Sequence, residues 1–476
     1  MIGRVRETRE LNTLYESGRP ELVAIFGRRR VGKTYLVDET FKGRITFRHA
    51  GLSPADQSGG GTLDAQLEHF YYSLRLQGCG ARKRPRSWLE AFFLLEQHLE
   101  QIDNGSRQLI FIDELPWLDT PRSGFITAFE GFWNTWACHR DNVMVVVCGS
   151  ASSWVLDKLV NNHGGLYNRV TYELELRPFT LAESEAFFRE RGVALSRYDI
   201  AQAAMIVGGV PYYLGYFQRD LSLAQNVDAL FFSPGARLRD EYGRLFSSIF
   251  DDSQQTQAIV SLLGTNRKGF TRGEIVKRLG TADGARLSDN LRALEASGFV
   301  IRYTPFGERA NAVRYKLVDA FCKFYLHFCS GASAQGEGFW QQNVSSHAVT
   351  SWRGFAFEDI CFGHIDQIKA ALGISGVATT QSAWSEETED GDSVQIDLLI
   401  SRNDNVVNMC EAKFYSDDFT VTKSYYRQLL RRQELLGGRI SPKAAVHSTL
   451  ITTFGLKHNE YSGLFTNVVT LDDLFK

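Results

Sequence analysis

The stretch from Leu22 to Glu39 constrains the fold most, because an apolar strand-like run meets a glycine-framed loop and then a helical pattern. The run Leu22–Phe26 leads into Gly27-Arg28-Arg29-Arg30-Val31-Gly32-Lys33-Thr34, and Tyr35–Glu39 continues as a helix. Glycines let the backbone N–H groups of such a loop converge on a polyphosphate, and the positive end of the helix adds to the attraction. The spacing therefore predicts a phosphate-binding loop between a strand and a helix.

The polar residues at the end of this loop have separate expected roles. Lys33 is expected to reach the β and γ phosphates of a bound nucleotide, and the Thr34 hydroxyl to hold Mg²⁺. The predicted contacts to the nucleotide are Gly27, Arg28, Arg29, Arg30, Val31, Gly32, Lys33, Thr34 and Tyr35. A surface loop that is merely rich in glycine and arginine is the alternative, and the flanking strand and helix argue against it.

A second apolar run, Gln108–Ile112, ends in two carboxylates, Asp113 and Glu114. A fully apolar run this short is typical of a central parallel strand that is buried on both faces. The carboxyl ends of the strands in a doubly wound sheet line the ligand crevice. Asp113 is therefore expected to hold Mg²⁺ through water, and Glu114 to polarise the attacking water. The alternative is a strand that merely ends in acidic residues.

Three later residues are further candidates for the same site. Ser150, after the apolar run Val143–Cys148, is expected to sense the γ phosphate or the water, or else to be a turn residue. Arg169 is expected to stabilise charge on the γ phosphate, within the chain or across a subunit boundary, or else to be a surface arginine. Pro211, in the segment GGVP, is expected to interrupt a helical run and to lie close to an adenine, or else to mark a helix–helix turn.

Composition excludes several other classes of protein. The formal net charge is −2 over 476 residues, so any contact with nucleic acid must come from local patches. The seven cysteines are scattered without a CxxC pair, which argues against a disulfide framework or a zinc ribbon. The start of the chain is polar, unlike a signal peptide, and the most apolar run is too short to cross a bilayer. We therefore predict a cytoplasmic protein with reduced thiols and no membrane partner.

Residues 254–317 have the sequence shape of a winged helix-turn-helix. The expected helices are Gln257–Leu263, Phe270–Leu279 with Thr271 as its cap, and Ala285–Ser297, and the expected hairpin strands are Phe299–Tyr303 and Val313–Leu317. The third helix is mixed in charge, whereas direct reading of DNA bases needs donors. An internal packing role or a partner role is therefore favoured over DNA reading.

The last part of the chain, after a small-residue linker at 330–338, places two carboxylates and a lysine on a strand pair. Asp397 lies in the first strand, and Glu411 and Lys413 lie in the second. A hairpin brings Asp397 and Glu411 to the same end of the sheet, and residues two apart point to the same face. Two carboxylates form a hard-oxygen Mg²⁺ site, and the lysine can orient or deprotonate a metal-activated water.

Other residues are secondary candidates for this second site. Glu358, in the helical stretch Phe355–Phe362, is a candidate third carboxylate, and Lys423 and Gln428 are candidates for packing near the site. The alternative is an ordinary hairpin with charged residues, because acidic and basic residues are common and the bare pattern is short.

Taken in order, these motifs resemble the archaeal-type ATPases of the STAND branch of the AAA+ class. The resemblance rests on Gly3-Arg4, GRRRVGKT, LIFIDE, CGS, the segment around Arg169, GGVP and the winged-helix pattern. The final domain is similar to the PD-(D/E)XK nuclease-like domain, of the DUF234 type, that is often fused to these ATPases. The resemblance covers essentially the whole chain, and its ATPase motifs are more specific than its short nuclease motif.

The resemblance implies an α/β fold in four parts. These are a P-loop parallel-sheet ATPase core (1–178), a helical lid (179–250), a winged helix-turn-helix (251–329) and a restriction-endonuclease-like α/β domain (330–476). The family likeness implies roles for the following residues: ATP and Mg²⁺ at Lys33, Thr34, Asp113 and Glu114, adenine near Pro211, and phosphodiester cleavage at Glu358, Asp397, Glu411 and Lys413. The triple arginine Arg28-Arg29-Arg30 departs from the family pattern, and its side chains are open to phosphates, a partner subunit or DNA.

Two functions from different classes follow from this sequence. The first is an ATP-regulated, metal-dependent nuclease that cleaves nucleic acid, with DNA as the expected substrate, in defence against mobile elements. The second is a STAND-type regulatory or scaffold ATPase, assembling as a homo-oligomer with ATP, whose C-terminal domain only binds DNA or a partner. The joint presence of Glu358, Asp397, Glu411 and Lys413 favours the first. A translocating helicase is disfavoured because the sequence shows no separate strand-separation motifs.

Overall fold

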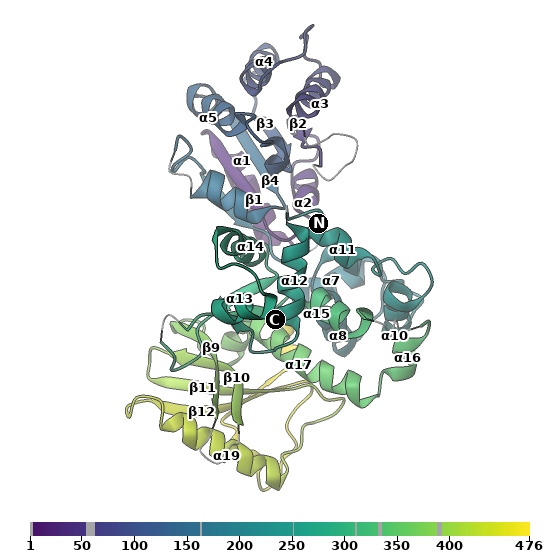
Figure 1. Cartoon of the computed structure of the whole chain (residues 1–476), viewed down its shortest axis with the longest axis vertical. Helices are drawn as coiled ribbons and strands as arrows, with labels where there is room; N and C mark the ends of the chain where they lie inside the picture. The colour runs from purple at the N-terminus through teal and green to yellow at the C-terminus, as the bar shows by residue number, and fades with distance from the viewer. Residues whose placement is uncertain are drawn as a thin grey trace. The chain divides into compact units, whose positions relative to one another are not determined.

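The computed structural model describes residues 3–53, 62–161, 164–250, 252–309, 312–331, 336–387 and 393–476. The chain divides into two compact units (Figure 1). The first consists of Met1–Pro178, Gly243–Gln257 and Gly284–Phe299, and the second of Phe179–Tyr242, Ala258–Asp283 and Val300–Lys476. Residues 179–242 of the predicted lid fall in the same unit as the C-terminal segment, whereas residues 243–250 belong to the first unit. The predicted winged-helix segment is also shared between the two units.

The first unit is built on a five-stranded parallel sheet with the strand order β2-β3-β4-β1-β5. Its strands are β1 (Glu21–Phe26), β2 (Ile45–Ala50), β3 (Gln108–Asp113), β4 (Val143–Gly149) and β5 (Tyr172–Glu175). The three central strands, β3, β4 and β1, are buried along their whole length. Burial on both faces is the reason their sequences are unbroken apolar runs, and it confirms the predicted α/β fold with a parallel sheet.

Helices cover both faces of this sheet. The elements of the unit outside the sheet are α1 (Val5–Tyr15), α2 (Lys33–Thr40), α3 (Leu63–Leu76), α4 (Trp88–Gln101), η1 (Leu115–Leu118), α5 (Phe125–Thr135), η2 (Ala137–His139), α6 (Ser152–Val155), η3 (Leu156–Val160) and α14 (Ala285–Ala296). Leu22 and Ala24 pack with α3, α4 and α5, whereas Val23 and Ile25 pack with α1 and α2. This alternation follows from the two-residue period of a strand.

His49 of β2 makes the first unit sensitive to acid. Its ring is buried, lies 4.8 Å from the ring of Phe70 between centroids and 5.1 Å from that of His69, and its Nδ1 is 2.9 Å from the hydroxyl of Ser73. Burial, reinforced by the neighbouring His69, lowers the pKa of His49 from 6.5 to about 3. Between these values the unfolded chain binds more protons than the folded chain, so stability decreases as the pH falls.

We expect His49 to lower the free energy of unfolding by about 2 kcal/mol between pH 7 and pH 5. The variant His49→Gln lacks this titration and should lose that part of the pH dependence. Urea unfolding of both proteins at the two pH values measures the difference. An equal pH dependence in the two proteins would contradict the assignment to His49.

The second unit contains a five-stranded mixed sheet with the strand order β13-β12-β11-β10-β9. Its strands are β9 (Thr379–Glu387), β10 (Ser393–Arg402), β11 (Val406–Lys413), β12 (Ala445–Thr452) and β13 (Asn467–Thr470). β9, β10 and β11 pair antiparallel, whereas β12 runs parallel to β11 and β13 runs parallel to β12. Helix α19 (Lys423–Gly437) makes the crossover from β11 to β12 and buries Leu429 and Leu436 in the core of this sheet.

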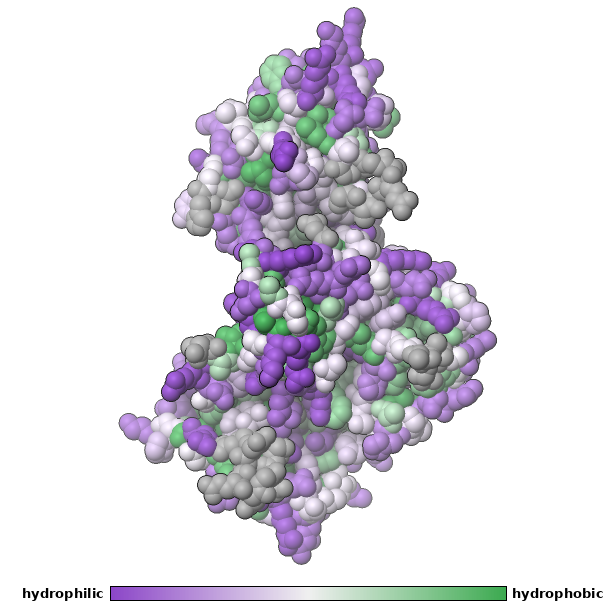
Figure 2. Space-filling view, viewed as in Figure 1, coloured by the Kyte–Doolittle hydropathy of each residue, from purple (hydrophilic) through white to green (hydrophobic). Residues whose placement is uncertain are grey.

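The rest of the second unit is mainly helical. Its helices are α7 (Leu181–Glu190), α8 (Arg197–Val207), α9 (Pro211–Leu214), α10 (Leu223–Val227), η4 (Asp228–Phe232), α13 (Arg272–Leu279), α15 (Ala320–Phe324), η5 (Tyr325–Cys329), α16 (Phe339–Asn343), α17 (His347–Gly363), α18 (Ile365–Ala371), η6 (Ser462–Leu464) and η7 (Leu471–Phe475). Two further helices, α11 (Glu241–Ser247) and α12 (Ser253–Gly264), cross the boundary between the units. No helix among the described residues is both long and apolar enough to span a bilayer. The face seen in Figure 2 is mostly hydrophilic and carries smaller apolar areas.

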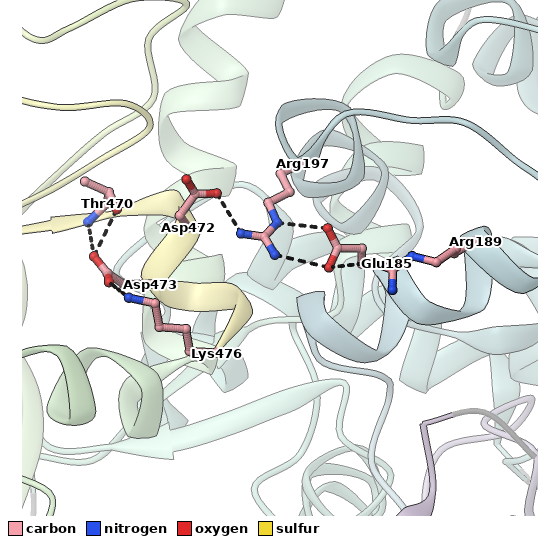
Figure 3. A network of polar contacts seen from close by, with 7 residues as sticks. All are labelled: Glu185, Arg189, Arg197, Thr470, Asp472, Asp473 and Lys476. Carbon is pink, nitrogen blue, oxygen red and sulfur yellow. Dashed lines mark hydrogen bonds and ion pairs between the residues drawn. The ribbon is translucent and has the colours of Figure 1, made fainter.

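A polar network within the second unit attaches η7 to the helices of the predicted lid (Figure 3). Arg197 of α8 pairs with Glu185 of α7 at 2.8 Å and with Asp472 of η7 at 2.9 Å. Its guanidinium also lies 4.8 Å from the centroid of the Phe475 ring. Because the hydrophobic side chains of η7 are buried as well, the lid helices and the C-terminal sheet are held together.

The helices and strands of the predicted winged helix lie near their expected positions. Thr271 caps α13 in a capping box with Glu274, as expected, although Phe270–Thr271 form the short strand β6. β6 joins β8 (Arg314–Leu317) and β7 (Val300–Tyr303) in a three-stranded sheet. The assembly of these elements with α14 as a winged helix remains a prediction.

Residues in both parts of the predicted winged helix that would face DNA make contacts within their own unit. On α14, Arg286 pairs with Asp252 at 2.7 Å, and Arg292 pairs with Asp289 at 2.8 Å. In the loop between β7 and β8, the backbone N–H of Phe306 donates to a carbonyl of β9 at 2.9 Å, and its ring packs on the core of the C-terminal sheet. The packing of Phe306 fits the internal packing role, whereas Arg286 and Arg292 stay 75% and 57% exposed in their ion pairs.

Candidate functional sites

The loop between β1 and α2 depends on close backbone contacts. Gly27 has a φ of 137°, and a Cβ at this position would lie 2.3 Å from the carbonyl oxygen of Leu176. Its N–H donates to the hydroxyl of Ser152 at 3.1 Å. Gly32, with a φ of 91°, is the N-cap of α2, so the free N–H groups of the first helical turn lie at the loop. The loop therefore has the backbone conformation that an anion site at a helix start requires.

Lys33, the first residue of α2, is folded back onto this loop. Its buried Nζ donates to the carbonyl oxygens of Gly27 at 2.8 Å and of Arg28 at 3.2 Å. Burial lowers the pKa of Lys33, while the nearby carboxylates of Glu114 and Asp113 act in the opposite direction. An ammonium group held by two neutral carbonyls can exchange them for phosphate oxygens, because the negative charge of the phosphate adds Coulomb attraction.

Thr34 and Asp113, the predicted Mg²⁺ ligands, are in direct contact. The Thr34 hydroxyl donates to Oδ2 of Asp113 at 2.7 Å, and Oδ1 accepts from the N–H of Glu114 at 3.0 Å. Burial raises the pKa of Asp113. No group of three or more His, Cys, Asp or Glu side chains that could hold a metal occurs in the described part of the chain. A hydroxyl and one carboxylate nevertheless fit Mg²⁺, which takes its other ligands from water and phosphate oxygens.

Glu114 is positioned by Ser150, a residue on the neighbouring strand end. Oε1 of Glu114 accepts from the Ser150 hydroxyl at 2.6 Å, and Oε2 accepts from the Ser150 N–H at 3.0 Å. Glu114 itself has a φ of 46°, a left-handed conformation that costs a non-glycine residue about 1 kcal/mol. Ser150 therefore contacts the predicted catalytic carboxylate, whereas the sequence led us to expect contact with the γ phosphate or the water.

The first two loop arginines contact residues of their own unit. Arg28 is 4% exposed, and its guanidinium lies 5.2 Å from the centroid of the Phe299 ring. Arg29 donates to the carbonyl oxygen of Ser248 at 3.3 Å and lies 5.8 Å from the centroid of the Trp117 ring. The sequence left phosphates, a partner subunit or DNA open as contacts of these arginines. The observed positions of the Arg28 and Arg29 side chains need neither a partner subunit nor DNA.

The remaining predicted residues of the loop differ in exposure. Val31 is buried, and its carbonyl accepts from the guanidinium of Arg4 at 3.3 Å. Arg30 has a left-handed φ of 73°, and Tyr35 is 59% exposed. Arg4, at the start of the described chain, thus packs against the phosphate loop from the side of α1.

Arg169 lies at the opposite end of the sheet from the phosphate loop. It is exposed in the turn before Thr171, whose N–H donates to the carbonyl of Leu22 at 2.8 Å, at the start of β1. Gly27 follows at the other end of β1, roughly 16 Å away at about 3.3 Å per residue. The register therefore contradicts the prediction that Arg169 reaches the γ phosphate within its own chain. Contact across a subunit boundary stays a prediction.

The GGVP segment ends one helix and begins the next. Gly208, with a φ of 64°, is the C-cap of α8, and Pro211 is the first residue of α9. Gly209 accepts from the N–H of Phe179 at 2.6 Å, and a Cβ at Gly209 would lie 1.8 Å from the Phe179 carbonyl oxygen. The expected helix break is present, and the expected proximity of Pro211 to adenine stays a prediction.

In the C-terminal sheet, the register brings the backbones of Asp397 and Glu411 together. Leu398 of β10 pairs with Cys410 of β11 in the antiparallel ladder. Asp397, one residue before Leu398, and Glu411, one residue after Cys410, therefore lie at the same end of the strand pair, as expected. The side chain of Asp397 lies outside the described residues.

Glu411 is buried, and both of its oxygens are already hydrogen-bonded. Oε1 pairs with Arg432 at 2.6 Å, Oε2 accepts from the hydroxyl of Tyr425 at 2.6 Å, and Nζ of Lys413 lies 3.6 Å from Oε2. Burial and the carboxylate of Glu411 raise the pKa of Tyr425, so its hydroxyl stays a donor. As arranged, each oxygen of Glu411 already accepts a hydrogen bond, so a metal at this carboxylate would share its oxygens with Arg432 and Tyr425.

Sequence reasoning missed the two α19 residues that reach Glu411. Lys423 and Gln428, the residues singled out on this helix, are exposed. Tyr425 and Arg432 are seven positions apart and share the inward face of α19 with its buried leucines. The helical period was therefore a usable signal. The other predicted carboxylate, Glu358, is half-buried on α17.

Comparisons with known proteins agree with the first site. Residues 1–217 match the family described as an ATPase domain predominantly from Archaea. The uncharacterized protein MJECL04 of Methanocaldococcus jannaschii is 24% identical over 454 residues, which cover 92% of each chain. The similarity to this relative thus extends well beyond the ATPase domain.

Two solved structures have a limited likeness to this chain. The Walker-type ATPase PABY2304 of Pyrococcus abyssi has a TM-score of 0.49 and 19% identity, covering 68% of this chain and 96% of its own. The ORC2 protein of Aeropyrum pernix, in ADPNP–ADP complexes, has a TM-score of 0.41 and 14% identity, covering 72% and 95%. Residues 1–217 thus match an ATPase domain of archaeal type, and the loop between β1 and α2 in this region has the geometry of a phosphate-binding loop.

Proposed function

We propose that this ATPase domain hydrolyses ATP as a switch that controls the C-terminal domain. The observation that carries the proposal is the convergence of Lys33, Thr34, Asp113 and Glu114 at the carboxyl ends of β1 and β3. Ser150 comes from the end of β4, the strand between them. Such an arrangement supplies each group that nucleotide hydrolysis needs.

Each residue has a role that follows from its contacts. The loop N–H groups and Lys33 bind the phosphates, with Lys33 leaving the carbonyls of Gly27 and Arg28. Thr34 and Asp113 would hold Mg²⁺, which offsets the phosphate charge when bound. Glu114 orients the attacking water and accepts its proton, and Ser150 holds the Glu114 carboxylate in place.

Ser150→Ala should lower the turnover number for ATP by about 10-fold, because Glu114 loses its hydroxyl donor and keeps only the backbone N–H. Ser150→Thr keeps a hydroxyl and serves as the matched control. Steady-state hydrolysis and nucleotide titration measure the two effects, and nucleotide affinity should stay within about twofold. A loss of affinity at unchanged turnover would show that Ser150 contacts the nucleotide instead.

For the C-terminal domain we propose metal-dependent cleavage of nucleic acid, with DNA as the first substrate to test. The support is the placement of Asp397 and Glu411 at one end of the β10–β11 pair, with Lys413 two residues further on. Action against mobile elements would follow from cleavage of foreign DNA. Arg432 and Tyr425 each donate to one oxygen of Glu411, so a metal bound there would compete with these two donors or share the oxygens with them.

The second candidate is a domain that binds DNA or a partner without cutting. A specific observation favours it: Glu411 serves as an acceptor that holds Arg432 and Tyr425 in place. A carboxylate used in this way orders cationic side chains that can bind phosphate, and it does not need a metal.

A nuclease assay separates these two candidates. Single- and double-stranded DNA and RNA are incubated with Mg²⁺ or Mn²⁺, with and without ATP, using wild type, Lys33→Met, Asp397→Ala and Asp404→Ala. Asp404 is the matched control, because it lies in the turn of the same hairpin and pairs with Arg402. Cleavage lost in Asp397→Ala and kept in Asp404→Ala, with ATP hydrolysis intact in both, supports the nuclease. Binding without cleavage of any substrate supports the second candidate.

A further inference from the structure

The side chain of Arg28 is given no role in the proposed hydrolysis, in contrast to the backbone of the phosphate loop, and its contacts link two parts of the first unit. Its carbonyl oxygen accepts from Nζ of Lys33 at 3.2 Å, so its backbone depends on the position of the lysine. Its side chain is buried, with the guanidinium 5.2 Å from the centroid of the Phe299 ring. A single residue therefore touches both the phosphate-binding lysine and a distant aromatic side chain.

Phe299 belongs to an aromatic cluster with two residues from the end of the predicted lid segment, which all lie in the first unit. Its ring centroid lies 5.3 Å from that of Phe246 and 5.8 Å from that of Phe250. Arg29 contacts the same region, because its guanidinium donates to the carbonyl of Ser248 at 3.3 Å. Arg29 thus contacts the segment after α11 directly, whereas Arg28 contacts the ring of Phe299, which packs on that segment.

Phe299 is also the residue at which the chain leaves the first unit. Its N–H donates to the carbonyl of Leu294 in α14 at 3.0 Å, and Val300 begins β7 of the second unit. A displacement of Phe299 therefore passes along the main chain into β7. No contact between the two units is needed for this transmission.

We propose that Arg28 is a positioning residue that transmits the state of the phosphate loop to Phe299, a role that rests on the proposed ATP switch. When phosphates draw Lys33 away from the carbonyls of Gly27 and Arg28, the backbone at Arg28 loses a hydrogen bond and changes position. The guanidinium is attracted to the face of the Phe299 ring, so the loop and the ring move together. The loop is the element with two states. In one state Lys33 donates to the carbonyls of Gly27 and Arg28, and in the other it donates to phosphate.

Hydrogen exchange with and without ADP or a non-hydrolysable ATP analogue tests this role. The variants are Arg28→Met, which removes the charge and keeps the length, and Phe299→Leu, which removes the ring. Phe250→Leu is the matched control, since it alters the same cluster without removing the ring under Arg28. Nucleotide affinity is measured for every protein.

In the wild type, nucleotide should change amide exchange in residues 294–303 by about fivefold or more. Arg28→Met and Phe299→Leu should abolish this response while nucleotide affinity stays within about threefold, and Phe250→Leu should keep it. An unchanged response in Arg28→Met would overturn the proposal. So would a loss of affinity of about 30-fold or more in that variant, because Arg28 would then be a phosphate ligand. Absence of nucleotide binding in the wild type would instead overturn the proposed ATP switch itself.

Discussion

Lys33→Met is expected to lower ATP hydrolysis by about 100- to 1,000-fold, the effect of removing one preorganised donor from a charge-stabilising site. Methionine keeps the length of the side chain and removes the ammonium group that donates to Gly27 and Arg28. Burial already disfavours the charge, as the lowered pKa of Lys33 shows, so folding should tolerate the change. Lys33→Met should therefore greatly lower the rate of ATP hydrolysis and leave the free energy of unfolding nearly unchanged.

Lys42→Met is the matched control for this prediction. Lys42 is exposed just after α2 and should have no effect on hydrolysis. Phosphate release from ATP and urea unfolding are measured for both variants and for the wild type. Hydrolysis by Lys33→Met at the wild-type rate would remove the basis for placing the phosphates at this loop.

Gly209→Ala is expected to destabilise the second unit by about 3 kcal/mol or more, because the new methyl group has no space. The Cβ would lie 1.8 Å from the carbonyl oxygen of Phe179 and 2.7 Å from its carbonyl carbon. The same two residues share a backbone hydrogen bond of 2.6 Å, so relief of the clash would break it. The backbone of Phe179 cannot move easily to relieve the clash, because the next residue, Thr180, caps the start of α7.

Gly354→Ala is the matched control, and it should change the free energy of unfolding in the opposite direction. Gly354 lies inside α17, and a Cβ there would meet nothing within 4 Å. Alanine in a helix interior is favoured over glycine by roughly 0.5–1 kcal/mol, so this variant should be slightly more stable. Urea unfolding measures both variants. A Gly209→Ala protein as stable as the wild type would mean that the close approach to Phe179 does not exist in solution.

The nucleotide site could be predicted from the sequence because its parts are local. Lys33 and Thr34 follow directly from a strand and a glycine-framed loop, and Asp113 and Glu114 end an apolar strand. In a parallel sheet these positions meet at one edge, whichever strands lie between them. The contact of Thr34 with Asp113 at 2.7 Å follows from that rule.

Residues whose partners come from elsewhere in the sheet were harder to interpret. Arg169 was expected near the γ phosphate, but β5 pairs with β1 so that the residue falls at the other end. Arg432 was missed because only the crossover of α19 over the C-terminal sheet brings its guanidinium to Glu411. For Arg169, the register of β5 against β1 decides which end of the sheet the residue reaches. For Arg432, the packing of α19 on the sheet decides it.

The amino-acid order alone determined the phosphate loop, the acidic strand end and the alternation of the hairpin carrying Glu411, because each depends on neighbours a few positions away. Only the tertiary structure decided that Ser150 holds Glu114 and that Arg28 lies over Phe299. These partners are brought together by strand order and by the return of a late segment to the first unit. Local spacing carries no information about such returns, because they are set by the burial of distant apolar surfaces against one another.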